Sequence, residues 1–192
     1  MNEILTILIG TIFVGNVVLT QYLGLCPFYG VSKKWGNSVG LAITSMLVLF
    51  VSIVLSYMVY TWILIPLDVT YLRLVVMMLM MVVLVHVIEK LVKRFLPTLL
   101  VLTQPYFPLL AMNSLALGTS LVVIDANFSM LEVIGYAFGA PLGFALVLIL
   151  FASMHERVLQ HDKVPHAFKG SAIAFIMTAL MAMAFMAFSG IV

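Results

Sequence analysis

Six long apolar stretches, separated by short polar clusters, make up most of this chain. A helix needs about 20 mostly apolar residues to cross the hydrocarbon of a bilayer, and these stretches approach or exceed that length. Membrane strands are not expected, because the apolar runs are too long and do not alternate with polar residues. The pattern therefore predicts six transmembrane helices, at about residues 4–25, 38–65, 70–88, 97–124, 130–154 and 170–191.

The composition agrees with a membrane protein and excludes a soluble globular domain. Sixty-five per cent of the residues are hydrophobic and 8% are charged, whereas a soluble domain is about a quarter charged. The first stretch is not expected to be a cleaved signal peptide, because Glu3 stands where a signal peptide carries basic residues. Since the loops are short, we expect residues 1–192 to form a single transmembrane domain with no soluble domain attached.

The basic residues predict the orientation of the helices in the membrane. All lysines and arginines except Arg73 follow the first, third or fifth stretch; they are Lys33, Lys34, Lys90, Lys93, Arg94, Arg157, Lys163 and Lys169. The positive-inside rule makes that face cytoplasmic. We therefore expect a multi-pass protein of the cell inner (plasma) membrane, with both termini on the non-cytoplasmic side.

The first and fourth stretches contain residues that interrupt helices. Proline removes a backbone donor and glycine loosens a helix, so each of these stretches is expected to be discontinuous. Each also opens a set of three helices, and two sets of three must run in opposite directions through the membrane. The predicted fold is an all-α membrane protein, an inverted repeat of three plus three helices with halves at about 1–95 and 96–192. Spans one and four are expected to break near the midplane, because of Gly24 and Pro27 in the first and Pro105 and Pro108 in the fourth. These spans also contain the polar or small residues Asn16, Gln21, Asn113, Ser114 and Gly118.

Other patterns receive structural interpretations. Small residues recur at helical spacing in the fifth stretch and predict close helix contacts. Three histidines follow that stretch at spacings that match no compact zinc motif, which indicates a solvated loop. A methionine run in the third stretch is interpreted as a lipid-facing or packing surface. These residues are Gly135, Gly139, Ala140 and Gly143; His155, His161 and His166; and Met77, Met78, Met80 and Met81.

Cys26 is the only cysteine, so the chain contains no internal disulfide. Two interpretations stay open. The thiol is either a small buried hydrophobic group or, given its position just before Pro27 at a helix break, a metal ligand or reactive thiol. Iron–sulfur centres usually take four ligands, so one thiolate cannot hold a cluster alone. Any such site must therefore be shared with a partner chain.

Four segments carry a resemblance to a known family. They are Leu-Gly-Leu-Cys-Pro-Phe at 23–28 with Gly-Val-Ser-Lys-Lys at 30–34, Phe-Pro-Leu-Leu at 107–110 with Asn113, Tyr-Ala-Phe-Gly-Ala at 136–140, and the tail from 168–171 to 188–190. Over essentially its whole length the chain resembles the A-type subunit of the Rnf (Rsx) ion-translocating electron-transport complex. That family is related to the D and E membrane components of the sodium-translocating NADH:quinone reductase.

The resemblance implies a function and a set of partners. It implies a six-span inverted repeat paired with a homologous membrane subunit of opposite topology, the E-type subunit, together with other Rnf subunits in the bilayer. Two cysteines from each of these two subunits are expected to hold an iron–sulfur cluster, [2Fe–2S], at their interface. The cluster would pass electrons between flavin and iron–sulfur subunits while sodium ions or protons are pumped. The chain would then be an electron-transfer subunit of a ferredoxin:NAD oxidoreductase-type translocase and not catalytic alone.

The chain departs from the family pattern at one decisive position. Cys26 matches the first cysteine ligand, but the family's Asn-Cys reads Asn113-Ser114 here. Serine ligates iron poorly because its alkoxide is hard to form, so Ser114 is expected to be a weak ligand or none. The serine is a deliberate replacement, belongs to a member with an altered cluster, or marks a member that has lost the cluster. The alternative function is a small inverted-repeat channel or transporter.

Overall fold

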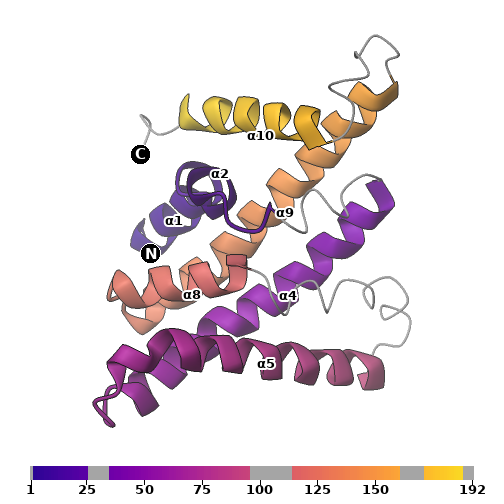
Figure 1. Ribbon diagram of the computed structural model, residues 1–192. Coiled ribbons are helices and arrows are strands. Elements are labelled where there is room, and N and C mark those ends of the chain that lie inside the picture. The colour runs from indigo at the N-terminus through magenta and orange to yellow at the C-terminus, as the bar shows by residue number, and fades with distance from the viewer. Residues whose placement is uncertain (1, 26–34, 96–113, 161–170, 188–192) are drawn as a thin grey trace.

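The computed structural model describes residues 2–25, 35–95, 114–160 and 171–187, and every regular element in these ranges is helical (Figure 1). The first half contains α1 (Asn2–Ile9), the π-helical turn η1 (Gly10–Val14), α2 (Val17–Gln21), α4 (Trp35–Val59), a second π-helical turn η2 (Tyr60–Leu64), the 3₁₀ turn η3 (Thr70–Leu72) and α5 (Arg73–Phe95). The second half contains α8 (Ser114–Asp125), α9 (Met130–Gln160) and α10 (Ser171–Met186).

Three of the described helical segments are long and apolar enough to cross a membrane. They are Ser38–Leu64, Thr70–Arg94 and Met130–Val158, and they confirm the second, third and fifth expected stretches. Shorter apolar helices at Ser114–Asp125 and Ala172–Met186 lie within the fourth and sixth. The protein is therefore an all-α, multi-pass membrane protein, while the count of six crossings stays a prediction.

The first expected stretch is not a continuous helix. The backbone widens into a π-helical turn in which Gly15 N–H donates to the carbonyl of Gly10 at 2.6 Å. Asn16 is extended (ψ 111°) and starts the short helix α2. That helix ends in left-handed residues, Tyr22 (φ 55°) and Gly24 (φ 80°). The interruption predicted at Gly24 is confirmed, and a second one lies upstream of it.

The fourth expected stretch is described only in part. Its residues from Ser114 onward form α8, which at 12 residues extends about 18 Å and is too short to cross the hydrocarbon by itself. Pro105, Pro108 and Asn113 lie outside the described residues, so the predicted break of this span is not described.

The helices α4 and α9 run side by side through the centre of the molecule and pack against each other over the largest contact (Figure 1). Helix α1 packs on α9 and helix α8 packs on α4, so the opening segment of each half contacts the second helix of the other half. Likewise α5 contacts α4 and α8, and α10 contacts α9 and α2. The core between α4 and α9 consists of buried apolar side chains, among them Leu41, Leu49, Ile53, Phe144, Leu148 and Phe151.

The third and fifth helices continue past the expected membrane stretches, and Lys90, Lys93 and Arg94 lie on α5. The expectation that His155 lies in a loop was wrong. His155 also lies on a helix, where it is 5% exposed and its ring stacks on Phe151 with centroids 5.5 Å apart. Residues four apart share a helix face, so His155 lies on the same buried face of α9 as Phe151, although polar residues follow it in the sequence. His161 and His166 lie outside the described residues.

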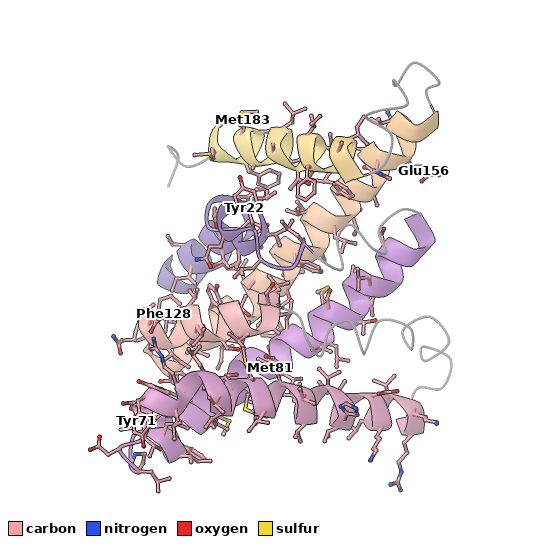
Figure 2. The ribbon with its side chains drawn as sticks, viewed as in Figure 1. Tyr22, Tyr71, Met81, Phe128, Glu156 and Met183 are labelled. Carbon is pink, nitrogen blue, oxygen red and sulfur yellow. The ribbon has the colours of Figure 1, made fainter. Side chains whose placement is uncertain are left out.

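The small residues of the fifth stretch do allow close helix contact. A Cβ atom added to Gly139 would lie 3.1 Å from Thr11 Cβ, and one added to Gly143 would lie 3.0 Å from Asn16 Nδ2. The interrupted first segment thus sits directly against α9. The methionine run both packs and faces outward, because Met77 and Met81 are buried while Met78 is exposed (Met81 is labelled in Figure 2).

Candidate functional site

The interrupted first segment meets the start of α8, and one hydrogen bond joins them. The backbone N–H of Gly24 donates to Ser114 Oγ at 3.2 Å. Ser114 is the first residue of α8, where helical N–H groups carry partial positive charge. The contact joins residues 90 positions apart and links the two halves of the chain. Ser114, predicted as a site residue, is therefore placed beside the break of the first segment.

Tight packing fixes this junction. A Cβ atom on Gly118 would lie only 2.2 Å from Leu23 Cδ1, so Leu23 occupies the space that any larger residue would need. A Cβ atom on Gly24 would lie 3.1 Å from Leu115 Cβ. The sequence pattern indicated that Gly24 and Gly118 loosen helices. Their observed role is to leave room for neighbouring side chains, Leu23 beside Gly118 and Leu115 beside Gly24.

Asn16 connects the same broken segment to α9. Its Nδ2 donates to the carbonyls of Ile12, at 3.1 Å, and Gly143, at 3.0 Å. Its Oδ1 accepts from the N–H of Val18 at 3.2 Å and so caps α2. Because Asn16 is only 2% exposed, these bonds form away from solvent. The asparagine was noticed in the sequence as a polar residue, but its capping role was missed; Asn is a preferred N-cap residue, which was the available signal.

The donor set for a metal or cluster is sparse. Cys26, the predicted thiolate ligand, lies outside the described residues. Within the described ranges no group of three or more His, Cys, Asp or Glu side chains comes together. Ser114 is an exposed residue, and its hydroxyl already accepts one hydrogen bond. Among the described residues this junction offers the Ser114 hydroxyl, and the sequence contains one thiol, so an iron–sulfur cluster would fit only if a partner supplied further ligands.

A polar edge lies at the far end of α8. Arg73 Nη1, at the start of α5, donates to Asp125 Oδ1, at the end of α8. Beside it, both the N–H and the hydroxyl of Ser129 donate to Glu132 Oε2, at 2.7 and 2.9 Å, and cap α9. One signal for the ion pair was present in the sequence, because Arg73 was the one basic residue expected on the non-cytoplasmic side. Its partner explains why it is tolerated there.

Comparisons with known proteins identify the class of this membrane protein. A family model described as "Rnf-Nqr subunit, membrane protein" matches residues 4–192. The chain belongs to this Rnf-Nqr family, as its resemblance implied. It is 46% identical over 192 residues to a protein of Pseudoalteromonas translucida (strain TAC 125), covering 100% of this chain and 99% of the relative.

Two further relatives show the same full coverage. A Vibrio vulnificus (strain YJ016) protein is 46% identical and a Pasteurella multocida (strain Pm70) protein is 42% identical, each over 192 residues and 100% of both chains. All three relatives are named as the A-type subunit of an ion-translocating oxidoreductase complex. The similarity therefore extends over the interrupted segment, α8 and the packed pair α4 and α9 together.

Proposed function

We propose that this chain is the A-type membrane subunit of an Rnf-type ion-translocating oxidoreductase complex. Its role there is to carry electrons through the membrane beside a homologous subunit of opposite topology. Full-length similarity to proteins that bear this subunit's name supports the assignment. The apolar composition also supports it, since a chain without a soluble domain must exchange electrons with other subunits.

The hydrogen bond from Gly24 N–H to Ser114 Oγ is the observation that carries the proposed site. Cys26 follows Gly24 by two positions in the sequence, a chain length of at most about 7–8 Å. This short connection supports the proposal that the sole thiol and Ser114 contribute to one site. We propose Cys26 as a ligand of a [2Fe–2S] cluster shared with the partner, and Ser114 as a weak ligand or none. Such a cluster supplies one-electron transfer when it is bound.

The contact pattern supports the proposed inverted repeat. If the two halves of the chain are compared in element order, α1 and α2 correspond to α8, α4 corresponds to α9, and α5 corresponds to α10. Under this correspondence the α1–α9 contact becomes the α8–α4 contact, and the α10–α2 contact becomes the α5–α8 contact. Repeats of this kind place functional sites where their broken helices meet. The proposed cluster position agrees with that rule. We also propose that both termini lie on the non-cytoplasmic side of the inner membrane.

Iron content of the purified complex tests the proposal. Ser114→Cys is expected to raise iron and visible absorbance, because it restores a thiolate ligand, whereas Cys26→Ala is expected to remove the iron bound at this interface. Ser153→Cys is the matched control. Its hydroxyl donates to Leu150 O on α9, so this variant introduces a thiol elsewhere and is expected to change nothing.

Two results would contradict the proposed cluster role. One is full iron occupancy that is unchanged by Cys26→Ala. The other is ion flux through the purified chain alone, without iron, which would favour the channel or transporter alternative.

A further inference from the structure

One glycine lets the end of the interrupted segment pack onto α8. Gly118 is the only residue of α8 that lacks a side chain. The side chain of Leu23 occupies the space beside it, since a Cβ atom on Gly118 would lie 2.2 Å from Leu23 Cδ1. Leu23 is partly buried and also packs against the main apolar core. Carbon atoms in contact normally lie about 3.5–4.0 Å apart, so any residue with a Cβ atom at this position would exclude Leu23 in its present place.

The same segment contacts α8 a second time, one helical turn away. The N–H of Gly24 donates to Ser114 Oγ at 3.2 Å. Ser114 precedes Gly118 by four residues, about 6 Å along α8, and residues four apart share a helix face. Leu23 and Gly24 therefore contact two positions on one face of α8. A shift of α8 by one residue would move it about 1.5 Å and rotate it by about 100°, which would separate both contacts at once.

Neighbouring side chains hold the backbone of Gly24 in place. A Cβ atom on Gly24 would lie 3.1 Å from Leu115 Cβ on α8 and 3.4 Å from Phe144 Cε2 on α9. Leu115 and Phe144 are each 1% exposed. Position 24 thus lies between two helices and has little room to follow a displacement of α8.

The hydrogen bond to Ser114 is sensitive to a small displacement. Its length of 3.2 Å is at the upper end of the usual range of about 2.7–3.2 Å for N–H···O bonds. A methyl group at position 118 would require about 1 Å of additional separation from Leu23. A displacement of that size between α8 and the segment breaks the bond.

We propose that Gly118 is a positioning residue for Ser114. By admitting Leu23 in one register of α8, it holds the Ser114 hydroxyl at the Gly24 N–H and fixes where residue 114 can meet a ligand. The last step rests on the proposed cluster role of Ser114, whereas the positioning of the hydroxyl does not. Groups at a functional site must be held within about 0.5 Å of their working geometry, which is less than the displacement that a methyl group at 118 would impose.

The amide resonance of Gly24 tests the positioning without iron. The full chain is labelled with isotopic glycine and purified in a mild detergent, and the Gly24 signal in its NMR spectrum is identified by its loss in Gly24→Ala. Ser114→Ala gives the amide proton shift of Gly24 without its acceptor. Gly118→Ala is expected to move the Gly24 resonance toward that shift and to accelerate its hydrogen exchange by about 2- to 12-fold, the net value of one hydrogen bond.

Two variants separate positioning from a general loss of packing. Gly139→Ala is the matched control, because its Cβ atom would lie 3.1 Å from Thr11 Cβ, in a different helix contact. It is expected to leave the Gly24 resonance unchanged. Adding Leu23→Ala to Gly118→Ala removes the colliding atom and is expected to return the resonance to its position in Leu23→Ala alone. If Gly118→Ala does not fold, the double variant is expected to restore folding.

Electron paramagnetic resonance of the reduced complex tests the link to the proposed cluster. Gly118→Ala is expected to shift the g-values of a cluster bound at this interface, whereas Gly139→Ala is expected to keep them. A complex without iron contradicts the proposed cluster and not the positioning of Ser114, which the Gly24 resonance decides.

The proposal is overturned if Gly118→Ala leaves the Gly24 resonance unchanged, or if Gly139→Ala moves it equally. It is also overturned if the double variant does not restore the folding lost in Gly118→Ala, or if a bound cluster keeps the same g-values in Gly118→Ala.

Discussion

Gly24→Ala tests whether the junction between the interrupted segment and α8 requires the absence of a side chain at position 24. Gly24 has φ +80°, and the left-handed region costs an L-residue about 1–2 kcal/mol. The added methyl would also lie 3.1 Å from Leu115 Cβ and 3.3 Å from Leu115 Cδ2, and overpacking of this kind costs about 1–3 kcal/mol. The two effects together predict a loss of about 2–5 kcal/mol in the free energy of unfolding.

Gly10→Ala is the matched control for the same change of residue type. Gly10 lies in the same segment, its Cβ would meet nothing within 4 Å, and it has no positive φ. Alanine there is expected to be neutral or to stabilise by up to about 1 kcal/mol through helix propensity.

The assay is unfolding of the purified protein in mixed micelles of a mild detergent and SDS, followed by near-UV circular dichroism. This readout reports loss of tertiary packing, which the junction is expected to control. A Gly24→Ala protein as stable as the Gly10→Ala protein would refute the reasoning, because neither strain nor crowding would then be present at position 24.

Three further predictions concern contacts between the two halves. Asn16→Ala removes the cap of α2 and the bond to α9, and is expected to lower the free energy of unfolding by about 2–4 kcal/mol in the same assay. A loss no larger than that of a helix cap alone would contradict a contribution from the bond to α9. Ser56 Oγ donates to Ser120 Oγ at 3.1 Å between α4 and α8, and a double-mutant cycle to alanine is expected to give a coupling of about 0.6 kcal/mol, as for polar pairs in membranes; zero coupling would contradict the bond. For the Arg73–Asp125 pair, whose side chains are 37% and 56% exposed, the same cycle is expected to give about 0.2–1 kcal/mol that falls with added salt; a salt-independent coupling would argue against an ion pair.

Hydropathy alone located the long helices, because every helix that crosses lipid must be mostly apolar over about 20 residues. The stretches at 38–65 and 130–154 agree with α4 and α9 to within a few residues at their starts. Their ends were less predictable, since a helix does not stop where the hydrocarbon stops. His155 illustrates the point: its charged neighbours suggested a loop, yet its spacing of four from Phe151 keeps it on the buried face of α9.

The break at Gly15 and Asn16 needed a different kind of signal. Proline and glycine draw attention to weak helix positions, and they directed the prediction toward Gly24 and Pro27. At Asn16 a buried amide side chain takes the place of regular helical backbone partners. Its Oδ1 accepts from Val18 N–H, and its Nδ2 donates to the Gly143 carbonyl. Half of that arrangement is local and could be anticipated from N-cap preferences. The other half depends on Gly143, which is 127 residues away, and only the packed structure supplies it.

The hydrogen bond at Ser114 bears on the reduction potential expected of the proposed cluster. Gly24 N–H donates to the oxygen of Ser114, the residue proposed to occupy the position of a second cysteine ligand. In the Ser114→Cys variant the same N–H would face a sulfur atom, and hydrogen bonds to cluster sulfurs raise a reduction potential. A second thiolate adds negative charge and lowers it. These two effects oppose each other, so restoring the cysteine is expected to change iron occupancy more strongly than the potential. The conformation of Gly24, set by φ +80°, is what holds that N–H in place for either atom.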